Sequence, residues 1–323
     1  MQGNNWLFGK RSIDLARDGF HRASNLPLVG WVVVHENQIQ TEGWLDSNLP
    51  HENQLAACLS KADFPKDSTL FINTNPLKNT EQLLQLATHY QIKEVQVADK
   101  INAELRQEEQ WVNRRYYTFH QQHRPYIVLK WAQTADGFVA RSNYDSKWIS
   151  GIHARKLVHQ WRSQEMAILV GKNTYRYDNP QLNVRNWSGK NPLRIVIDPK
   201  QTLNKNLSVF DQCHPTLCYT QSPPGNLPNL EYTSLPQTTD WYAKISYVLS
   251  NLYHRNVASV FVEGGAQLLS FLIQHGWWDE ARVFTSESEF GEGISAPLLN
   301  ENYLVEEKLV SQDQLSIYFH PRS

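Results

Sequence analysis

Hydrophobic positions along the chain recur with two periods, the two-residue alternation of strands and the three-to-four-residue spacing of helices. In the first 115 or so residues, the stretch 29–44 predicts two strands around a His-Glu-Asn-Gln turn. Further strands are expected over 68–74 and 93–99. Helical patterns separate them, over residues 5–20, 51–62, 79–91, with Asn79 or Thr80 as N-cap, and 102–115. Strands spaced by helices predict an open α/β sheet.

The second half repeats this alternation with longer apolar runs. Continuous apolar stretches are typical of strands covered on both faces, and they occur at 126–132, 166–171, 193–198 and 258–265. Helices are expected over 151–163 and over 266–276, and a further strand over 280–288. The polar stretch 117–125 separates the two halves. We therefore expect two α/β domains, residues 1–122 and 123–323, the second with a largely parallel centre.

Composition narrows the class of protein. Lys plus Arg total 31 against 32 Asp plus Glu, a balance that argues against general binding to nucleic acid or to a membrane surface. The N-terminus lacks the apolar core of a signal peptide, and no apolar run reaches membrane-spanning length, so we expect a cytoplasmic protein. The three cysteines, Cys58, Cys213 and Cys218, are expected to be reduced thiols.

Chemistry-bearing residues follow the expected strands of the second half. Glu263 ends a strand, and Gly264 and Gly265 then open a helix whose first N–H groups can bind an anion. Gly171 and Thr174 form a similar turn. Lys130 lies in an apolar strand, where a charge needs a partner or a role. Taken singly, each feature also has a structural explanation, such as a tight βα loop, a core Trp148 or a solvated Arg185.

The set and order of these stretches resemble the reductase domain of the bifunctional riboflavin-biosynthesis deaminase/reductase family, which has a dihydrofolate-reductase-like fold. The matching stretches are RPYIVLKWAQTADG, DSKWISG, WRSQEMAILVGKNTYRYDNPQLNVR, LRIVID and FVEGGAQLL, between residues 124 and about 300. The resemblance implies NADPH-dependent reduction of the ribosyl group of 5-amino-6-(5-phosphoribosylamino)uracil to a ribityl group. The choice between NADPH and NADH stays open at this point.

The resemblance also implies roles for individual residues. Substrate contacts are expected from Ser146, Arg162, Leu182, Arg185 and Glu263, with the two arginines suited to a phosphate. Lys130, Asp136 and Glu263 are expected near the reacting ribose, Lys130 in proton delivery or in stabilising the open-chain imine. Cofactor contacts are expected from Ala132, Trp148, Gly171, Thr174, Asp178, Gly264, Gly265, Ala266 and Gln267.

The N-terminal half of this family is a zinc deaminase similar to cytidine deaminases, which needs a His-x-Glu motif and a later pair of cysteines. Here His51 stands where the zinc histidine belongs, but Asn53 occupies the catalytic glutamate position and Leu77 the first cysteine position. Glu52, one residue away, is turned by about 100° on a helix. A catalytic zinc normally takes three protein ligands. We therefore expect a deaminase fold, three-layered, without zinc and without deaminase activity.

Several functional alternatives remain from the sequence alone. These are a reductase of another pyrimidine or of a pterin, a non-catalytic regulatory or binding subunit, and a residual deaminase. The expected partners are the phosphoribosyl-pyrimidine substrate, a second copy of the chain in a homodimer, and a separate deaminase acting upstream. Two phosphate-suited arginines with Glu263 favour a phosphorylated sugar over a pterin.

Overall fold

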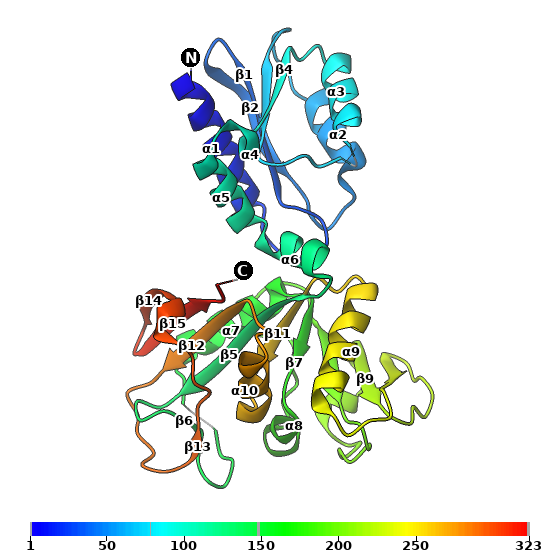
Figure 1. Ribbon diagram of the computed structural model, residues 1–323, viewed down its shortest axis with the longest axis vertical. Coiled ribbons are helices and arrows are strands. Elements are labelled where there is room, and N and C mark those ends of the chain that lie inside the picture. The colour runs from blue at the N-terminus through cyan, green and yellow to red at the C-terminus, as the bar shows by residue number, and fades with distance from the viewer. Residues whose placement is uncertain (1, 78, 147–148, 322–323) are drawn as a thin grey trace. The chain divides into compact units, whose positions relative to one another are not determined.

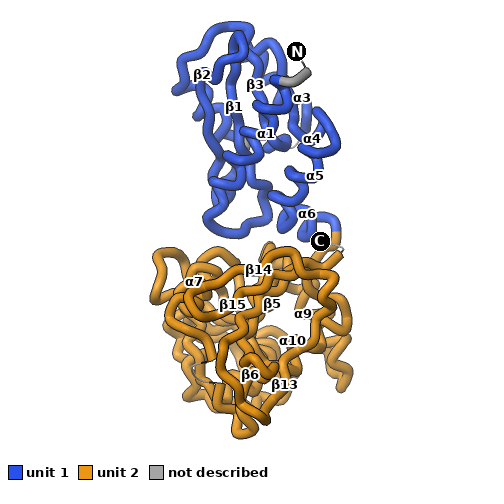
Figure 2. The backbone as a smooth tube through the Cα atoms, turned by 90° about the vertical axis from the view of Figure 1, so that its left-hand side faces the viewer, with its two compact units in different colours: residues 1–121 blue, residues 122–323 orange. Residues whose placement is uncertain are grey.

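The computed structural model describes residues 2–77, 79–146 and 149–321. The chain divides into two compact units, residues 1–121 and residues 122–323 (Figure 2). Each unit has its own sheet and its own apolar core. Within the described residues, no helix combines the length and the apolarity that crossing a bilayer requires.

The first unit is built on a four-stranded sheet in the order β2-β1-β3-β4. Strand β1 pairs antiparallel with β2 and β3, and β3 pairs parallel with β4. Glu36 and Asn37 join β1 to β2 with φ of 47° and 62°, the left-handed pair that a tight hairpin turn requires. The strands are β1 Val29–His35, β2 Gln38–Leu45, β3 Thr69–Ile72 and β4 Glu94–Val97.

Helices cover both faces of this sheet and make three layers (Figure 1). Because side chains alternate along a strand, Trp31 and Val33 pack toward Leu55 while Val32 packs toward Leu15 on the opposite face. Asn79 caps α3, its side chain accepting from the Gln82 N–H. The helices are α1 Gln2–Asp18, η1 His51–Asn53, α2 Gln54–Ser60, α3 Thr80–His89, α4 Ala98–Ile101, α5 Ala103–Val112 and α6 Arg114–Gln122.

The second unit is built on a nine-stranded sheet in the order β10-β9-β8-β7-β11-β5-β12-β15-β14. The strands from β10 to β12 run parallel, and β15 and β14 add an antiparallel edge. A separate pair joins β6 to β13. The strands are β5 Tyr126–Gln133, β6 Phe138–Ala140, β7 Ala167–Leu169, β8 Leu193–Ile197, β9 Thr216–Thr220, β10 Leu230–Ser234, β11 Ser259–Glu263, β12 Glu280–Thr285, β13 Ile294–Ser295, β14 Leu304–Val310 and β15 Asp313–Phe319.

Helices again lie on both faces of the sheet. One core includes Val158 of α7 and Tyr175 of α8, and the other includes Val248 of α9 and Leu272 of α10. These helices return the chain between parallel strands, as crossover connections do. The helices are α7 Ile152–Gln164, α8 Lys172–Asp178, η2 Ser208–Phe210, α9 Trp241–His254, α10 Ala266–Gln274 and η3 Glu301–Tyr303.

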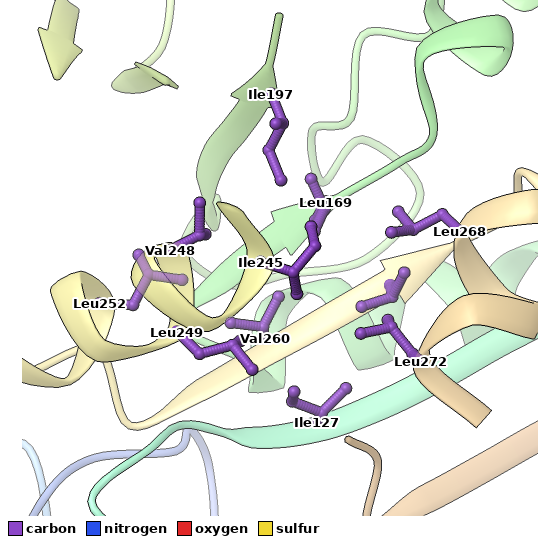
Figure 3. Close-up of a pocket in the computed structure, with 11 residues that line it drawn as sticks. Ile127, Leu169, Ile197, Ile245, Val248, Leu249, Leu252, Val260, Leu268 and Leu272 are labelled. Atoms are coloured by element: carbon purple, nitrogen blue, oxygen red, sulfur yellow. The ribbon is translucent and has the colours of Figure 1, made fainter. Parts of the chain in front are cut away.

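A small cavity lies between the sheet and the helices α9 and α10 (Figure 3). Its volume is about 10 Å³, and apolar side chains such as Ile127, Val248 and Leu272 line it. A space of this size barely admits one water molecule, and it offers no polar partner for one. The cavity is therefore a packing gap in the core, and the candidate site lies elsewhere, at the edge of the sheet.

Candidate functional site

The carboxyl ends of three parallel strands bring the candidate residues of the second unit together. Lys130 on β5 pairs in register with Glu263 on β11, and the Gly264 N–H donates to the Lys130 carbonyl at 3.1 Å. Strand β7 lies on the other side of β11 and leads into Gly171. In open α/β sheets, ligands bind beyond the carboxyl ends of the strands. The geometry therefore favours this edge as the site.

Arg162 and Glu263 form a two-pronged ion pair at the centre of the edge. Arg162 lies on α7, and its Nε and Nη2 donate to the two Glu263 oxygens at 2.6 and 2.7 Å. Both side chains are about nine-tenths buried. Burial opposes ionisation of Glu263, but the Arg162 guanidinium outweighs it and holds the pKa of Glu263 below its ordinary value. The pair is therefore fully charged at neutral pH.

This pairing changes the role that the sequence predicts for Arg162. Its Nη1 donates to the Asn183 carbonyl at 3.0 Å, so three of the five guanidinium N–H groups are used within the protein. Arg185, in contrast, is exposed, and of its side chain only Nη1 donates within the described chain, to Asn183 Oδ1 at 3.1 Å. Arg185 is thus the arginine with donors available to a phosphate, while Arg162 orients Glu263.

Lys130 brings its side-chain amine to the same edge of the sheet. Its side chain is half-buried, its Nζ lies 5.7 Å from the centre of the Phe284 ring, and it makes no hydrogen bond to any residue that the structure describes. Burial lowers the pKa of Lys130, although the Glu263 carboxylate acts in the opposite direction. A lysine with a lowered pKa, next to a carboxylate, is suited to donate a proton.

Two glycine turns lie next to the Arg162–Glu263 pair and Lys130 at this edge of the sheet. Gly264 and Gly265 have φ of 75° and 80°, conformations that other residues rarely adopt. A Cβ on Gly265 would lie 2.9 Å from the Gly171 Cα, so the two turns touch backbone to backbone. Among the described residues, a Cβ on Gly264 would meet only Thr174 Oγ1, at 3.8 Å, and no other atom of them would lie within 4 Å.

These turns fit a dinucleotide phosphate. Open space borders Gly264, and helix α10 begins immediately afterwards at Ala266 and Gln267. The free N–H groups of a first helical turn bind phosphate oxygens. The residues present therefore fit the cofactor that the sequence predicts.

A second group of predicted residues meets at the end of α8. Ser146 Oγ donates to the Asp178 carboxylate at 3.3 Å, and the rings of Tyr144 and Tyr177 stack in parallel with centroids 4.2 Å apart. Ala132 lies on β5 opposite Phe284 of β12. Trp148, the remaining predicted cofactor contact, lies outside the described residues.

Asp136 has a different setting from Lys130 and Glu263. Its carboxylate accepts from the Thr134 hydroxyl at 2.5 Å and from the backbone N–H groups of Phe290 and Gly291 at 3.0 and 2.6 Å. These bonds tie the β5–β6 turn to the loop after β12. Asp136 therefore holds this loop in place, and its role near the reacting ribose stays a prediction.

Sequence reasoning missed two contributors to the site, His159 and Asn183. His159 is buried one helical turn before Arg162, and its Nδ1 accepts from the Arg185 N–H at 3.4 Å. The three-residue spacing on α7 places both side chains on one face and could have indicated His159. Nothing in the sequence indicates Asn183, which takes part through its carbonyl.

The corresponding place in the first unit lacks a ligand set. His51 begins η1 and is buried, and its ring nitrogens find no well-formed hydrogen bond among the described residues. Burial lowers its pKa and raises that of Cys58, which packs with Leu77 against the apolar core. Within the described residues, no three His, Cys, Asp or Glu side chains gather as metal ligands. The described residues around His51 therefore offer fewer than the three ligands that a catalytic zinc takes.

Comparisons with known proteins agree with this architecture. Residues 125–314 match the family described as the RibD C-terminal domain. The riboflavin biosynthesis protein RibD of Aquifex aeolicus is 30% identical over 297 residues, covering 83% of each chain. The RibD of Synechocystis is 29% identical over 316 residues, covering 89% of this chain and 85% of that protein.

A solved structure covers both units. The diaminohydroxyphosphoribosylaminopyrimidine deaminase/5-amino-6-(5-phosphoribosylamino)uracil reductase of Thermotoga maritima matches with a TM-score of 0.79 and 26% identity, over 98% of this chain and 99% of that one. The predicted fold, a deaminase-like α/β domain followed by a dihydrofolate-reductase-like α/β domain, is confirmed. The chain therefore belongs to the RibD family of riboflavin biosynthesis and carries the reductase domain of that family.

Proposed function

We propose that this protein is an NADPH-dependent 5-amino-6-(5-phosphoribosylamino)uracil reductase, which converts the ribosyl group of its substrate to a ribityl group. One observation carries the proposal. The cation of Lys130 lies without a hydrogen-bond partner among the described residues, beside the buried Arg162–Glu263 pair and next to the paired glycine turns. This arrangement offers an acid, an acceptor for sugar hydroxyls and a phosphate cradle at one edge.

The cofactor is proposed to lie along the glycine turns. Gly171, Thr174, Gly264 and Gly265 form the cradle, and the first turn of α10 would face its phosphates. Bound NADPH supplies a hydride. Further contacts are proposed for Ala132, Asp178, Ala266 and Gln267.

The substrate is proposed to lie across the Arg162–Glu263 pair. Arg185 would bind the sugar phosphate, because its donors are exposed. Glu263, held in one orientation by Arg162, would accept hydrogen bonds from the ribose hydroxyls. Lys130 holds a proton at Nζ within the same edge, where it can neutralise charge on the opened sugar. Ser146 and Leu182 complete the proposed substrate contacts.

The test of the reductase is NADPH oxidation that depends on the deaminated phosphoribosylamino-uracil. We expect turnover with NADPH and a rise in melting temperature when NADPH binds. A parallel titration with NADH measures the preference between the two cofactors. Absence of turnover with either cofactor, at substrate concentrations that saturate related reductases, contradicts the proposal.

We further propose that the first unit performs no deamination. Three observations on the described residues support this: the His51 ring lacks a well-formed hydrogen bond, Leu77 packs in an apolar setting, and no ligand cluster forms. A separate deaminase would then supply the substrate. Metal analysis of the purified protein is expected to find far less than one zinc per chain. Stoichiometric zinc, or ammonia release from the pyrimidine precursor, would overturn this proposal.

A further inference from the structure

The segment that carries Arg185 is held to its surroundings at three points. The Asn183 carbonyl accepts from Arg162 Nη1 at 3.0 Å, and the Val184 N–H donates to Asn191 Oδ1 at 2.7 Å. The third point is the Arg185 N–H, which donates to His159 Nδ1 at 3.4 Å. The backbone of Arg185 is therefore fixed although its side chain is exposed.

This segment needs such anchors because it contains a strained residue. Leu182 is buried and has φ of 54°, a left-handed conformation that is costly for a branched side chain. Strained residues persist where the surrounding contacts over-determine them. The residues that follow Leu182 receive these contacts as a hydrogen bond from Arg162 and as hydrogen bonds donated to Asn191 and His159.

His159 is built to act as an acceptor at this position. Only 4% of the residue is exposed, and burial, with the nearby charges of Arg162 and Arg185, lowers its pKa to about 4. The ring is therefore neutral at physiological pH, and a neutral imidazole has one ring nitrogen that accepts. The bond from Arg185 identifies that nitrogen as Nδ1.

We propose that His159 is a positioning residue that sets the preference of the site for a phosphorylated sugar, by fixing the backbone from which Arg185 reaches the phosphate. This inference rests on the proposed function. Three of the five Arg162 N–H groups donate to Glu263 and Asn183, whereas the exposed Arg185 side chain donates only from Nη1 within the described chain, so we assign phosphate recognition to Arg185. A side chain attached to a fixed backbone loses less freedom on binding than one on a mobile loop.

The substitutions isolate the Nδ1 acceptor. His159→Leu removes it, and His159→Asn restores an oxygen near the position of Nδ1. His159→Gln keeps a polar side chain but moves its acceptor outward, and it replaces the Leu variant if that variant does not fold. The exposed His153 on the same helix provides the matched control, His153→Asn.

The kinetic readout compares the phosphorylated substrate with its dephosphorylated ribosyl analogue. We expect His159→Leu to raise the KM for the phosphorylated substrate about tenfold, which corresponds to about 1.4 kcal/mol, with little change in kcat. The KM for the analogue stays unchanged, and His159→Asn recovers most of the loss. In an Arg185→Ala background, His159→Leu adds little, because the group that it positions is gone.

A binding readout keeps this test independent of turnover. Calorimetric titration with ribose 5-phosphate and with ribose is expected to show that only the phosphorylated sugar loses affinity in His159→Leu and in Arg185→Ala. A wild-type protein that binds ribose 5-phosphate in this way but reduces no pyrimidine would refute the proposed function and leave the inference standing. Equal losses for both sugars, additive effects in the double variant, or no difference from His153→Asn would overturn the inference.

Discussion

The two α/β units differ in how the buried polar side chains of their candidate sites are hydrogen-bonded. In the second unit, the buried charges of Arg162 and Glu263 bond to each other, and further polar contacts extend from Arg162 to Asn183. In the first unit, His51 is also buried but its ring has no well-formed hydrogen bond to a described residue. Apolar periodicity is enough to preserve a fold around His51, whereas the buried charges of Arg162 and Glu263 are tolerated because they satisfy each other.

The largest effect is expected from removing one partner of the buried pair. Glu263→Gln leaves Arg162 charged and unpaired, which costs about 3–5 kcal/mol of unfolding free energy. We expect reductase kcat/KM to fall at least about a hundredfold as well. Urea unfolding and steady-state kinetics measure the two effects. Glu306→Gln breaks an exposed pair with Lys308 and should cost less than about 1 kcal/mol, so similar losses in both variants would refute the contrast.

Lys130 should affect the reaction more than the fold. Lys130→Gln is expected to reduce kcat about a hundredfold if the ammonium is the acid, while NADPH affinity stays within about twofold. Burial lowers the pKa of Lys130, so the amine loses its proton at a lower pH than an ordinary lysine does. The wild-type kcat should therefore start to fall, as pH rises, before the ordinary lysine pKa is reached. That decline should vanish in the variant. An unchanged pH profile of kcat would remove Lys130 from the proton transfer.

Glu109 extends the comparison of the two units, because it is a buried carboxyl group of the first unit that does have hydrogen-bond donors. Asn113 Nδ2 and the Tyr117 hydroxyl donate to its carboxylate at 2.8 and 2.7 Å, and burial raises its pKa to about 7. The folded state therefore binds the proton more tightly than the unfolded state. The contribution of Glu109 to the unfolding free energy is fully present at pH values below the pKa that Glu109 has in the unfolded chain. It is lost as pH rises toward about 7, the pKa in the folded state.

The expected loss is about 2 kcal/mol of unfolding free energy between about pH 5.5 and about pH 8. Glu109→Gln should remove this pH dependence. Urea unfolding at the two pH values measures it, and hydrogen exchange of the α5 amides assigns it to the first unit. A variant with the same pH dependence as the wild type would show that another group titrates.

The smallest effect is expected at His51. His51→Leu replaces a buried imidazole that lacks a well-formed hydrogen bond by an apolar side chain of similar size, so the unfolding free energy should change by less than about 1 kcal/mol, in either direction. Chelator treatment should leave the melting temperature of both proteins unchanged. A metal-dependent melting temperature that His51→Leu abolishes would place a functioning metal site in the first unit.

The apolar pattern predicted much of the fold, including the β1–β2 hairpin, the parallel centre of the second sheet and the Asn79 cap. Strands β9 and β10, helix α9 and the antiparallel pair β14–β15 were not predicted. Strand β14 shows one reason. Val305 and Leu309 are exposed there, so the edge strand lacks the alternation of a half-buried one.

The candidate site divides in the same way. Glu263 and the glycine turns were predicted to stand at or directly after the ends of strands, and parallel strands bring such ends together at one edge of a sheet. The pairing of Arg162 with Glu263 joins residues 101 positions apart and depends on the packing of α7 against β11. Sequence reasoning therefore gave both arginines to the phosphate, and the hydrogen bonds favour Arg185 alone.

The contact between Gly171 and Gly265 bears on how such a protein can change over time. A single methyl group on Gly265 would press against the Gly171 backbone at 2.9 Å, in a conformation that alanine already disfavours. A side chain at Gly265 therefore requires the backbone of the Gly171 turn to move. The first unit carries the same kind of constraint at Gly30, where a Cβ would lie 2.1 Å from the Ser12 carbonyl oxygen, so in both units such a position can change only together with the backbone around it.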